Sequence, residues 1–113
     1  MIDTVAAPAL LATLFRGLAD PARLSCVLAL RDRSRTVGEI VAATGLSQPN
    51  VSKHLACLRD CGLVQAERSG RHVTYCLCGT GVEELLCAAD ALLARAGASI
   101  AACPDNRGAE GPC

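Results

Sequence analysis

The order of apolar and polar residues predicts helices through the first half of the chain. Residues 8–18 (PALLATLFRGL) form a short amphipathic segment, with apolar positions at helical spacing. A second helix is expected after Asp20, which suits an N-cap, with Pro21 at its first helical position. A third helix is expected at VGEIVAAT, where Thr36 and Glu39 fit a capping box.

A fourth helix is predicted directly after the third. Gly45 ends the third helix, and Ser47 caps the segment QPNVSKHLACLRDC. Within this segment Val51, Leu55 and Leu58 fall at i, i+4 and i+7, which is the spacing of one buried helix face. Two short helices joined by such a tight turn have the form of a helix-turn-helix.

From Gly62 onward the period of the pattern falls toward two, which indicates strands. The segments LVQAER and RHVTYCL flank Ser69-Gly70, as expected for a β-hairpin with a tight turn. A hairpin directly after a helix-turn-helix is a wing. The predicted fold class is therefore mainly α with a β-hairpin wing, a winged helix-turn-helix.

Residues 82–96 return to helical spacing, with an apolar stripe that holds its place over two heptads. The stripe consists of Val82, Leu85, Leu86, Ala89, Leu92, Leu93 and Ala96. Phe15 and Tyr75 are the only aromatic residues, so the core is small and dimerisation through the terminal helices is expected. We expect one domain over residues 1–97 and a flexible, Cys-containing tail over residues 98–113.

The formal charge is zero overall, but it is unevenly distributed. Residues 21–72 hold eight basic against four acidic residues, whereas residues 73–113 hold two basic against five acidic residues. A basic middle is a mild signal for nucleic acid, and the alternative is an ordinary solvated helix face. In a winged helix-turn-helix the second helix enters the major groove, and the wing tip reaches the backbone or the minor groove. The residues predicted to contact double-stranded DNA are Ser47, Gln48, Asn50, Ser52, Lys53, His54, Arg68, Arg71 and His72.

Eight cysteines are many for 113 residues, so a secreted disulfide scaffold is the first interpretation to exclude. No basic segment precedes the apolar residues 5–14, as a signal peptide would require, and the cysteines fall inside predicted helices and strands. No uncharged apolar run approaches the ~20 residues of a membrane span. We expect a cytoplasmic protein with reduced thiols, in which clustered cysteines indicate metal binding or redox chemistry.

Cys57 and Cys61 lie one turn apart at the end of the fourth predicted helix. At this spacing the Cβ atoms are about 5–6 Å apart, close enough for both sulfurs to bind one metal ion. His54 shares the stripe and could add a ligand, although a place near DNA is favoured. The alternative for the pair is two small, half-buried side chains that close a helix.

Three segments of the chain resemble the winged helix-turn-helix repressors of the ArsR/SmtB family. They are LADPARLSCVLAL, VGEIVAATGLSQPNVSKHLACLRDCGLV and ERSGRHVTYCL. The resemblance covers roughly residues 10–96. It implies a homodimer that binds an inverted-repeat operator when it is free of effector and releases the operator when the effector binds.

The family's effector sites differ in position, and several are missing here. VGEIVAAT has none of the cysteines of the arsenic-type site, and the last helix has none of the histidines of the zinc and nickel sites. The ending CLRDCGLV resembles the CmtR-type cadmium/lead sensors, in which a third cysteine comes from the tail of the other protomer. This resemblance implies a metal site at Cys57, Cys61 and Cys103, with Cys113 as a spare.

Three thiolates form a soft site, which favours Cd(II), Pb(II), Zn(II), Cu(I) or arsenite over hard cations. The resemblance to the CmtR-type sensors implies Cd(II) or Pb(II) as the effector, with Zn(II) possible. A thiol-redox or persulfide sensor would instead pair Cys26 with Cys87, although Cys26 lies earlier in its helix than that pattern expects and is otherwise typical of a core residue. Cys76 and Cys78 share a strand face and form either a second thiol site or a pair without a role.

A metal carrier that does not bind DNA is the candidate from another class of protein. An enzyme is not expected, because no phosphate-binding loop, nucleophile–base pair or C-x-x-C motif is present.

Overall fold

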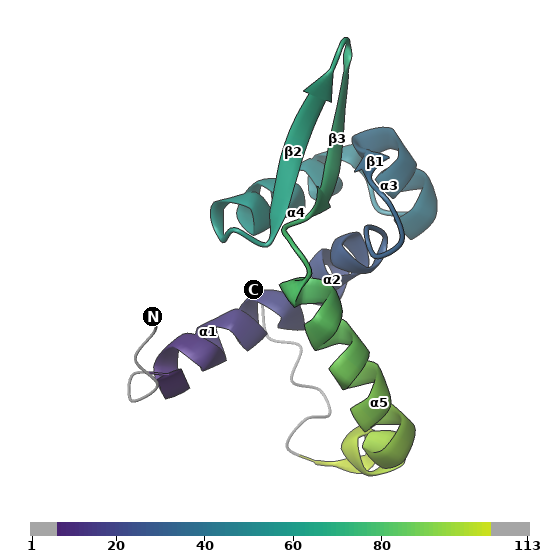
Figure 1. The fold of residues 1–113 in the computed structure, drawn as a ribbon. Coiled ribbons are helices and arrows are strands. Elements are labelled where there is room, and N and C mark those ends of the chain that lie inside the picture. Colours follow the sequence, from purple (N-terminus) through teal and green to yellow (C-terminus); the bar gives the residue numbers. More distant parts are fainter. Residues whose placement is uncertain (1–6, 105–113) are drawn as a thin grey trace.

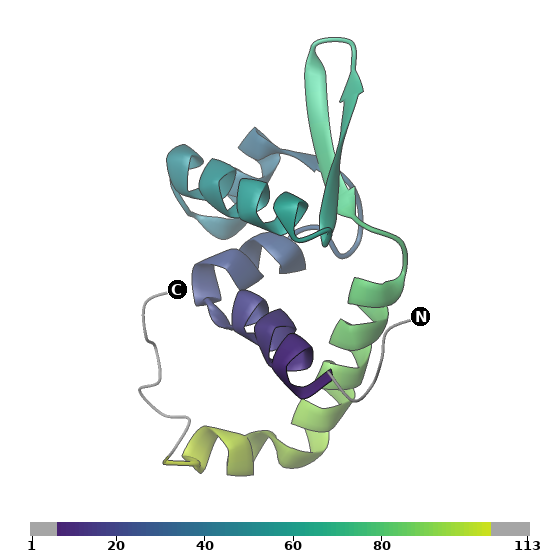
Figure 2. The same ribbon diagram turned by 90° about the vertical axis from the view of Figure 1, so that its left-hand side faces the viewer.

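The computed structural model describes residues 7–104, and it confirms a winged helix-turn-helix (Figure 1). The four helices before the wing pack against one another, and the hairpin projects beyond them (Figure 2). The elements are α1 (Ala7–Ala19), α2 (Pro21–Leu28), β1 (Arg35–Thr36), α3 (Val37–Thr44), α4 (Gln48–Asp60), β2 (Val64–Ser69), β3 (His72–Leu77) and α5 (Gly81–Ala102).

The predicted helix caps are all present. The Asp20 carboxylate accepts a hydrogen bond of 3.1 Å from the backbone N–H of Arg23 at the start of α2. Thr36 and Glu39 form the reciprocal capping box of α3. Gly45 ends α3 with φ 77°, a left-handed conformation that glycine adopts without the strain of a Cβ. The turn at Gly45 lets α4 begin only a few residues after α3 ends.

A third strand, β1, was not predicted. It is only two residues long, and it extends the hairpin to an antiparallel sheet in the order β1-β3-β2. Arg35 pairs with Tyr75, and Thr36 pairs with Thr74. Two residues carry no alternation of apolar and polar side chains, and Thr36 also serves as the α3 N-cap, so the sequence signal at this position was that of a helix start.

The core lies between α2, α3, α4 and the base of the wing. Its fully buried members include Val27, Ile40 and the predicted stripe residues Val51, Leu55 and Leu58. At the base of the wing, Val64 of β2 is also buried. α4 is therefore held along one face by the core, and its other face is exposed to solvent.

α5 is longer than the sequence predicted. The apolar pattern ended at residue 96, whereas the helix continues through Gly97 to Ala102, so residues 98–102 of the predicted flexible tail are helical. The segment ASIAA contains good helix formers, and a single glycine inside a long helix costs only about 1 kcal/mol. Cys113 and the rest of the tail beyond residue 104 lie outside the described residues.

Only the first turns of α5 contribute to the core. Val82 and Leu86 are buried, but Leu92 and Leu93 are about half exposed, at 49% and 52%. Within the described part of the chain, α5 is the one helix long and apolar enough to cross a membrane, with a mean hydropathy of 1.5. An amphipathic helix that packs on another protein surface has the same properties, and Glu83 and Asp90 interrupt its apolar sequence.

Candidate nucleic-acid interface and thiol site

The N-terminal part of α4 exposes polar side chains, as the DNA prediction requires. Ser47 caps the helix by accepting a hydrogen bond of 3.3 Å from the Asn50 N–H. At the tip of the wing the two strands end at Ser69 and His72, which face each other across Gly70 with φ 61°. The predicted contacts found exposed are Ser47, Gln48, Asn50, Ser52, Lys53, Arg68, Arg71 and His72.

His54 is the exception, and its assignment to the DNA interface is wrong. Its side chain is buried, with 7% of the residue exposed. The Nε2 atom lies 3.7 Å from the Asp20 carboxylate, and Nδ1 is buried without a hydrogen-bond partner among residues 7–104. The spacing contained the signal, because His54 is three residues after Val51 and four before Leu58 and therefore shares their buried face.

Asp20 and Arg23 form a polar connection beneath the recognition helix that the sequence did not reveal. Asp20 caps α2 and also faces His54 of α4. The Arg23 guanidinium donates a 2.8 Å hydrogen bond to the carbonyl of Gly17 in α1, while its Nε is buried with no hydrogen-bond partner in the described part of the chain. Three helices therefore meet around two charged side chains, close to the C-terminal end of α4.

Cys57 and Cys61 are both free thiols at that end of α4. Cys57 is half-buried, whereas Cys61 is exposed and forms the helix C-cap. Partial burial raises the pKa of the Cys61 thiol, and the adjacent Cys57 raises it further, against an opposing effect of the Arg23 guanidinium. The two thiols are thus near neighbours, as the i, i+4 spacing predicted, and they offer a soft metal ion two ligands.

Cys103 does not complete a site with these two thiols inside one protomer. It is the C-cap of α5. The C-terminal end of α5 lies at the far end of the molecule from α4 and the wing (Figures 1 and 2). Over residues 7–104, no group of three or more Cys, His, Asp or Glu side chains is placed to hold a metal ion. A three-thiolate site at Cys57 and Cys61 therefore needs a ligand from outside the described residues of this protomer.

The remaining cysteines have distinct surroundings. Cys26 is completely buried in the core, as predicted, and burial raises its pKa. Cys76 accepts a hydrogen bond of 3.4 Å from the Gln65 amide, and Cys78 donates its backbone N–H to the carbonyl of Leu63. Cys76 lies in β3 and Cys78 just after it, and neither belongs to a group of three or more metal-binding side chains among the described residues.

Cys87 belongs to a polar cluster that fastens α5 to the segment after α2. Arg31 binds both carboxylate oxygens of Glu83, at 2.9 and 2.8 Å, and donates a third hydrogen bond of 2.9 Å to Asp90. The Cys87 thiol donates to Glu83 over 3.1 Å. The Arg31 guanidinium, followed by the Cys87 thiol, lowers the pKa of Glu83 to about 2, and the Glu83 carboxylate raises the pKa of Cys87.

The fold, the exposed polar face of α4 and the wing define a winged helix-turn-helix regulator that binds DNA. The family model of bacterial regulatory proteins of the arsR family matches residues 20–66. The chain is 41% identical over 92 residues to a probable mercury resistance operon repressor of Streptomyces lividans, covering 81% of this chain and 74% of that protein. The chain therefore belongs to the arsR family, a family of transcriptional regulators and not of enzymes.

Two further relatives are similar to the chain over different lengths. The regulator CmtR of Mycobacterium tuberculosis is 51% identical over 67 residues, which is 59% of this chain and only 57% of CmtR. The solved structure of CmtR, titled a cadmium metal-sensor, matches with a TM-score of 0.59 at 45% identity over 66% of this chain and 78% of that chain. The homodimeric winged helix-turn-helix domain of Mb0332 from Mycobacterium bovis matches with a TM-score of 0.70 at 30% identity, over 87% and 91% of the two chains.

Proposed function

We propose that this chain is a metal-responsive transcriptional repressor of the bacterial cytoplasm. Its homodimer binds an inverted-repeat operator when free of metal and leaves the operator when Cd(II) or Pb(II) binds a cysteine site. The observation that carries the proposal is the free thiol pair Cys57 and Cys61, which ends the same helix that presents polar side chains to DNA. One rigid element thus joins the effector site to the reading residues.

Dimerisation is supported by the apolar surface of the two terminal helices. The large apolar side chains exposed there are Leu10, Leu11 and Phe15 of α1 and Leu92, Leu93 and Ile100 of α5. Exposed apolar groups gathered on two helices are typical of an interface. A two-fold dimer places two copies of α4 at fixed separation, which matches an operator made of two inverted half-sites.

The third ligand in this proposal is the partner's Cys103. Within one protomer Cys103 lies away from the thiol pair, but α5 carries it outward beyond the protomer's own core. Coordination by three thiolates requires their deprotonation, so binding releases protons and is favoured by rising pH. The CmtR relative, titled a cadmium metal-sensor, supports the choice of a soft divalent ion, with Zn(II) as a weaker alternative.

Such coordination would tie the C-terminal end of α4 to the partner's α5. A small shift of α4 relative to the dimer axis changes the separation of the two reading helices. Allosteric coupling of about 1–3 kcal/mol is typical, which corresponds to roughly 5- to 150-fold weaker operator binding.

An anaerobic titration of the reduced dimer with Cd(II) tests the proposal. Thiolate–metal charge-transfer absorption should saturate at one metal per protomer, and operator release should follow the same curve. Cys57→Ser, Cys61→Ser and Cys103→Ser should each weaken both responses, whereas Cys76→Ser is the matched control and should change neither. A Cys57→Ser protein that still leaves DNA on addition of Cd(II) contradicts the assignment.

A mercuric ion is a second candidate effector, because two thiolates in a line satisfy it. Cys57 and Cys61 are already neighbours, so no tail ligand would be needed. The relative described as a probable mercury resistance operon repressor supports this candidate. Release by Hg(II) that survives Cys103→Ser, together with no release by Cd(II), would favour it over the three-thiolate site.

A redox sensor, an arsenite sensor and a metal carrier have less support from the structure and the relatives. A redox pair of Cys26 and Cys87 would require Cys26 to be reached by an oxidant, and it is completely buried. An arsenite sensor would use the same three thiolates as the cadmium site, so the choice between them depends on the titration. Membership in a family of transcriptional regulators disfavours a metal carrier that does not bind DNA.

A further inference from the structure

Arg23 is a half-buried cation whose hydrogen bonding is incomplete. Its guanidinium donates a hydrogen bond to the Gly17 carbonyl, and its backbone N–H donates one to the Asp20 carboxylate. The Nε–H group is shielded from solvent and has no acceptor among residues 7–104. Buried donors without an acceptor are unfavourable and rare in folded proteins, so this one calls for a physical explanation.

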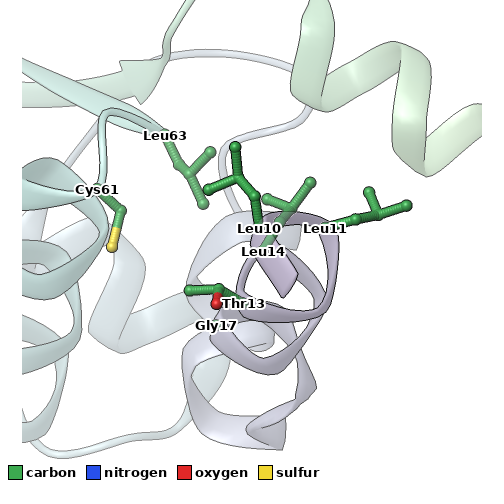
Figure 3. Close-up of a pocket in the computed structure, with 7 residues that line it drawn as sticks. All are labelled: Leu10, Leu11, Thr13, Leu14, Gly17, Cys61 and Leu63. Carbon is green, nitrogen blue, oxygen red and sulfur yellow. The ribbon is translucent and has the colours of Figure 1, made fainter. Parts of the chain in front are cut away.

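The position of Arg23 places it between α1 and the C-terminal end of α4. Gly17, which accepts its hydrogen bond, lines the same pocket as Cys61 (Figure 3). Asp20 faces His54, which precedes Cys57 by three residues on α4. The positive charge also acts on the Cys61 thiol, because it opposes the rise in pKa that burial and Cys57 cause there.

The charge of a metal–thiolate complex makes a nearby cation useful. Three thiols that bind one Cd(II) or Pb(II) ion release three protons, so the complex carries one net negative charge. Two thiolates bound to Hg(II) form a neutral complex. A partly buried anion is unfavourable unless a cation or a hydrogen-bond donor lies beside it, whereas a neutral complex has no such requirement.

We propose that Arg23 is a positioning residue of the metal site, and that its charge and its Nε–H group stabilise the anionic complex of Cys57, Cys61 and a third thiolate. In this role Arg23 favours ions that take three thiolates over ions that two thiolates satisfy. Because the same guanidinium binds the Gly17 carbonyl, it also connects the metal site to α1. The inference rests on the metal site of the proposed function, but not on release of the operator.

Competition with a chelator measures the Cd(II) affinity of the reduced full-length protein without DNA. Arg23→Gln removes the charge and the Nε–H group, and it should weaken Cd(II) binding by roughly tenfold to a hundredfold. Arg23→Lys keeps the charge but not the Nε–H group, so it should lose less. Arg59→Gln is the matched control, since Arg59 is exposed on the last turn of α4 between the two cysteines, and it should change the affinity by at most about threefold.

Hg(II) separates stabilisation of the complex from a merely structural role of Arg23. In a protein that also carries Cys103→Ser and Cys113→Ser, the pair at the end of α4 supplies two thiolates, and the Hg(II) complex is neutral. Competition with glutathione measures the Hg(II) affinity of this protein with and without Arg23→Gln. The two affinities should agree within about threefold. Equal losses for Cd(II) and Hg(II) would show that Arg23 only supports the fold around the cysteines, and would overturn the proposal.

Nuclear magnetic resonance tests the contact in the protein without any substitution. Binding of Cd(II) enriched in an NMR-active isotope should move the Arg23 Nε–H signal and give it a coupling to cadmium through the N–H···S hydrogen bond. The Arg59 Nε–H signal should show neither change. An Arg23 signal that stays in place while Cd(II) binds contradicts the proposal, as does full Cd(II) affinity in Arg23→Gln.

The outcomes for this inference and for the proposed function can be told apart. Cd(II) binding that depends on Arg23 but does not release the operator supports the inference and contradicts the proposed function. Operator release by Cd(II) that is unaffected by Arg23→Gln has the reverse meaning. Failure of Cd(II) to bind Cys57 and Cys61 at all would overturn both.

Discussion

The DNA-reading unit (α2, α3, α4 and the wing) and the two terminal helices (α1 and α5) bury their apolar side chains to very different extents. In α2, α3 and α4, large residues such as Ile40, Leu55 and Leu58 are at most 1% exposed. In α1 and α5, large residues such as Leu11, Phe15 and Leu93 remain about half exposed. The reading unit therefore supplies most of the core, to which the terminal helices add only Leu18, Val82 and Leu86. The terminal helices also carry apolar faces that a second surface would cover.

This difference separates two tasks in one small chain. Folding of the reading unit depends on internal packing, whereas association depends on residues that add little to that packing. The thiol pair lies at the boundary, because Cys57 and Cys61 lie at the end of α4 and Cys61 also lines a pocket together with residues of α1 (Figure 3). A ligand at this position can therefore act on both regions.

The largest expected effect on folding comes from the core of the reading unit. Ile40→Ala removes a completely buried side chain and should lower the free energy of unfolding by about 2–5 kcal/mol. Urea denaturation followed by circular dichroism measures this loss. Leu93→Ala is the comparison in a terminal helix, and at concentrations where the protein is monomeric it should cost well under half as much. Equal losses at both positions would remove the distinction between the regions.

Dimerisation, in contrast to folding, should depend on the terminal helices and not on the core of the reading unit. Leu93→Glu places a charge on the exposed apolar face of α5, and it should weaken dimerisation by roughly tenfold to a hundredfold, because a carboxylate is costly to bury in an interface. Sedimentation velocity across a dilution series measures the change. Leu28→Glu is the matched control, since Leu28 is an exposed apolar residue outside the terminal helices. If Leu28→Glu disrupts the dimer as much, the interface does not lie on α5.

Two adjacent residues of α4 show the same contrast within one helix. Lys53 is exposed and His54 is buried, so Lys53→Ala should weaken operator binding by about 1 kcal/mol and reduce the salt dependence by about one unit of slope. His54→Leu should leave the salt slope unchanged and alter the free energy of unfolding instead. Fluorescence anisotropy at several salt concentrations separates these outcomes. A reduced slope for His54→Leu would return that residue to the DNA interface.

Local sequence signals predicted most of the fold because they act over a few residues. The caps at Asp20, Thr36 and Ser47 and the buried stripe of α4 are all readable from spacing, and each is present. His54 shows where residue type and spacing disagree. Its polar side chain suggests a DNA contact, but its position on the stripe places it in the core, and the spacing is the better guide.

The remaining features depend on contacts between distant segments. The pairing of Arg35 with Tyr75 joins residues forty positions apart. The sequence around neither residue contains a local pattern that predicts this pairing. The ion pairs of Arg31 with Glu83 and Asp90 could not be predicted from the sequence either, because any other exposed arginine could have paired with those carboxylates. The thiol pair was predicted since both cysteines lie on one helix, whereas the position of Cys103 depends on how a second chain packs.

The smallest expected effect concerns the Arg31 cluster, which fastens α5 to the reading unit. Arg31 and Cys87 lower the pKa of Glu83 to about 2, so the folded protein takes up this proton less readily than the unfolded chain, whose Glu has the ordinary pKa of 4.5. The stabilisation is therefore present above about pH 4.5 and is lost as the pH falls toward 2. Arg31→Met should lower the melting temperature near neutral pH, and the difference from the original protein should shrink through this acid range.

The pH dependence distinguishes the ion pair from simple packing of the Arg31 side chain. Loss of packing alone would give two melting curves that stay parallel as the pH falls, whereas loss of the Glu83 pair makes them converge. Glu83→Gln should reproduce the convergence, because it keeps the shape of the side chain and removes the charge that Arg31 binds. Since Glu83 is exposed, solvent screens the pair and the shift should be small. A Glu83→Gln protein that melts in parallel with the original would show that the Glu83 pair does not stabilise the attachment of α5.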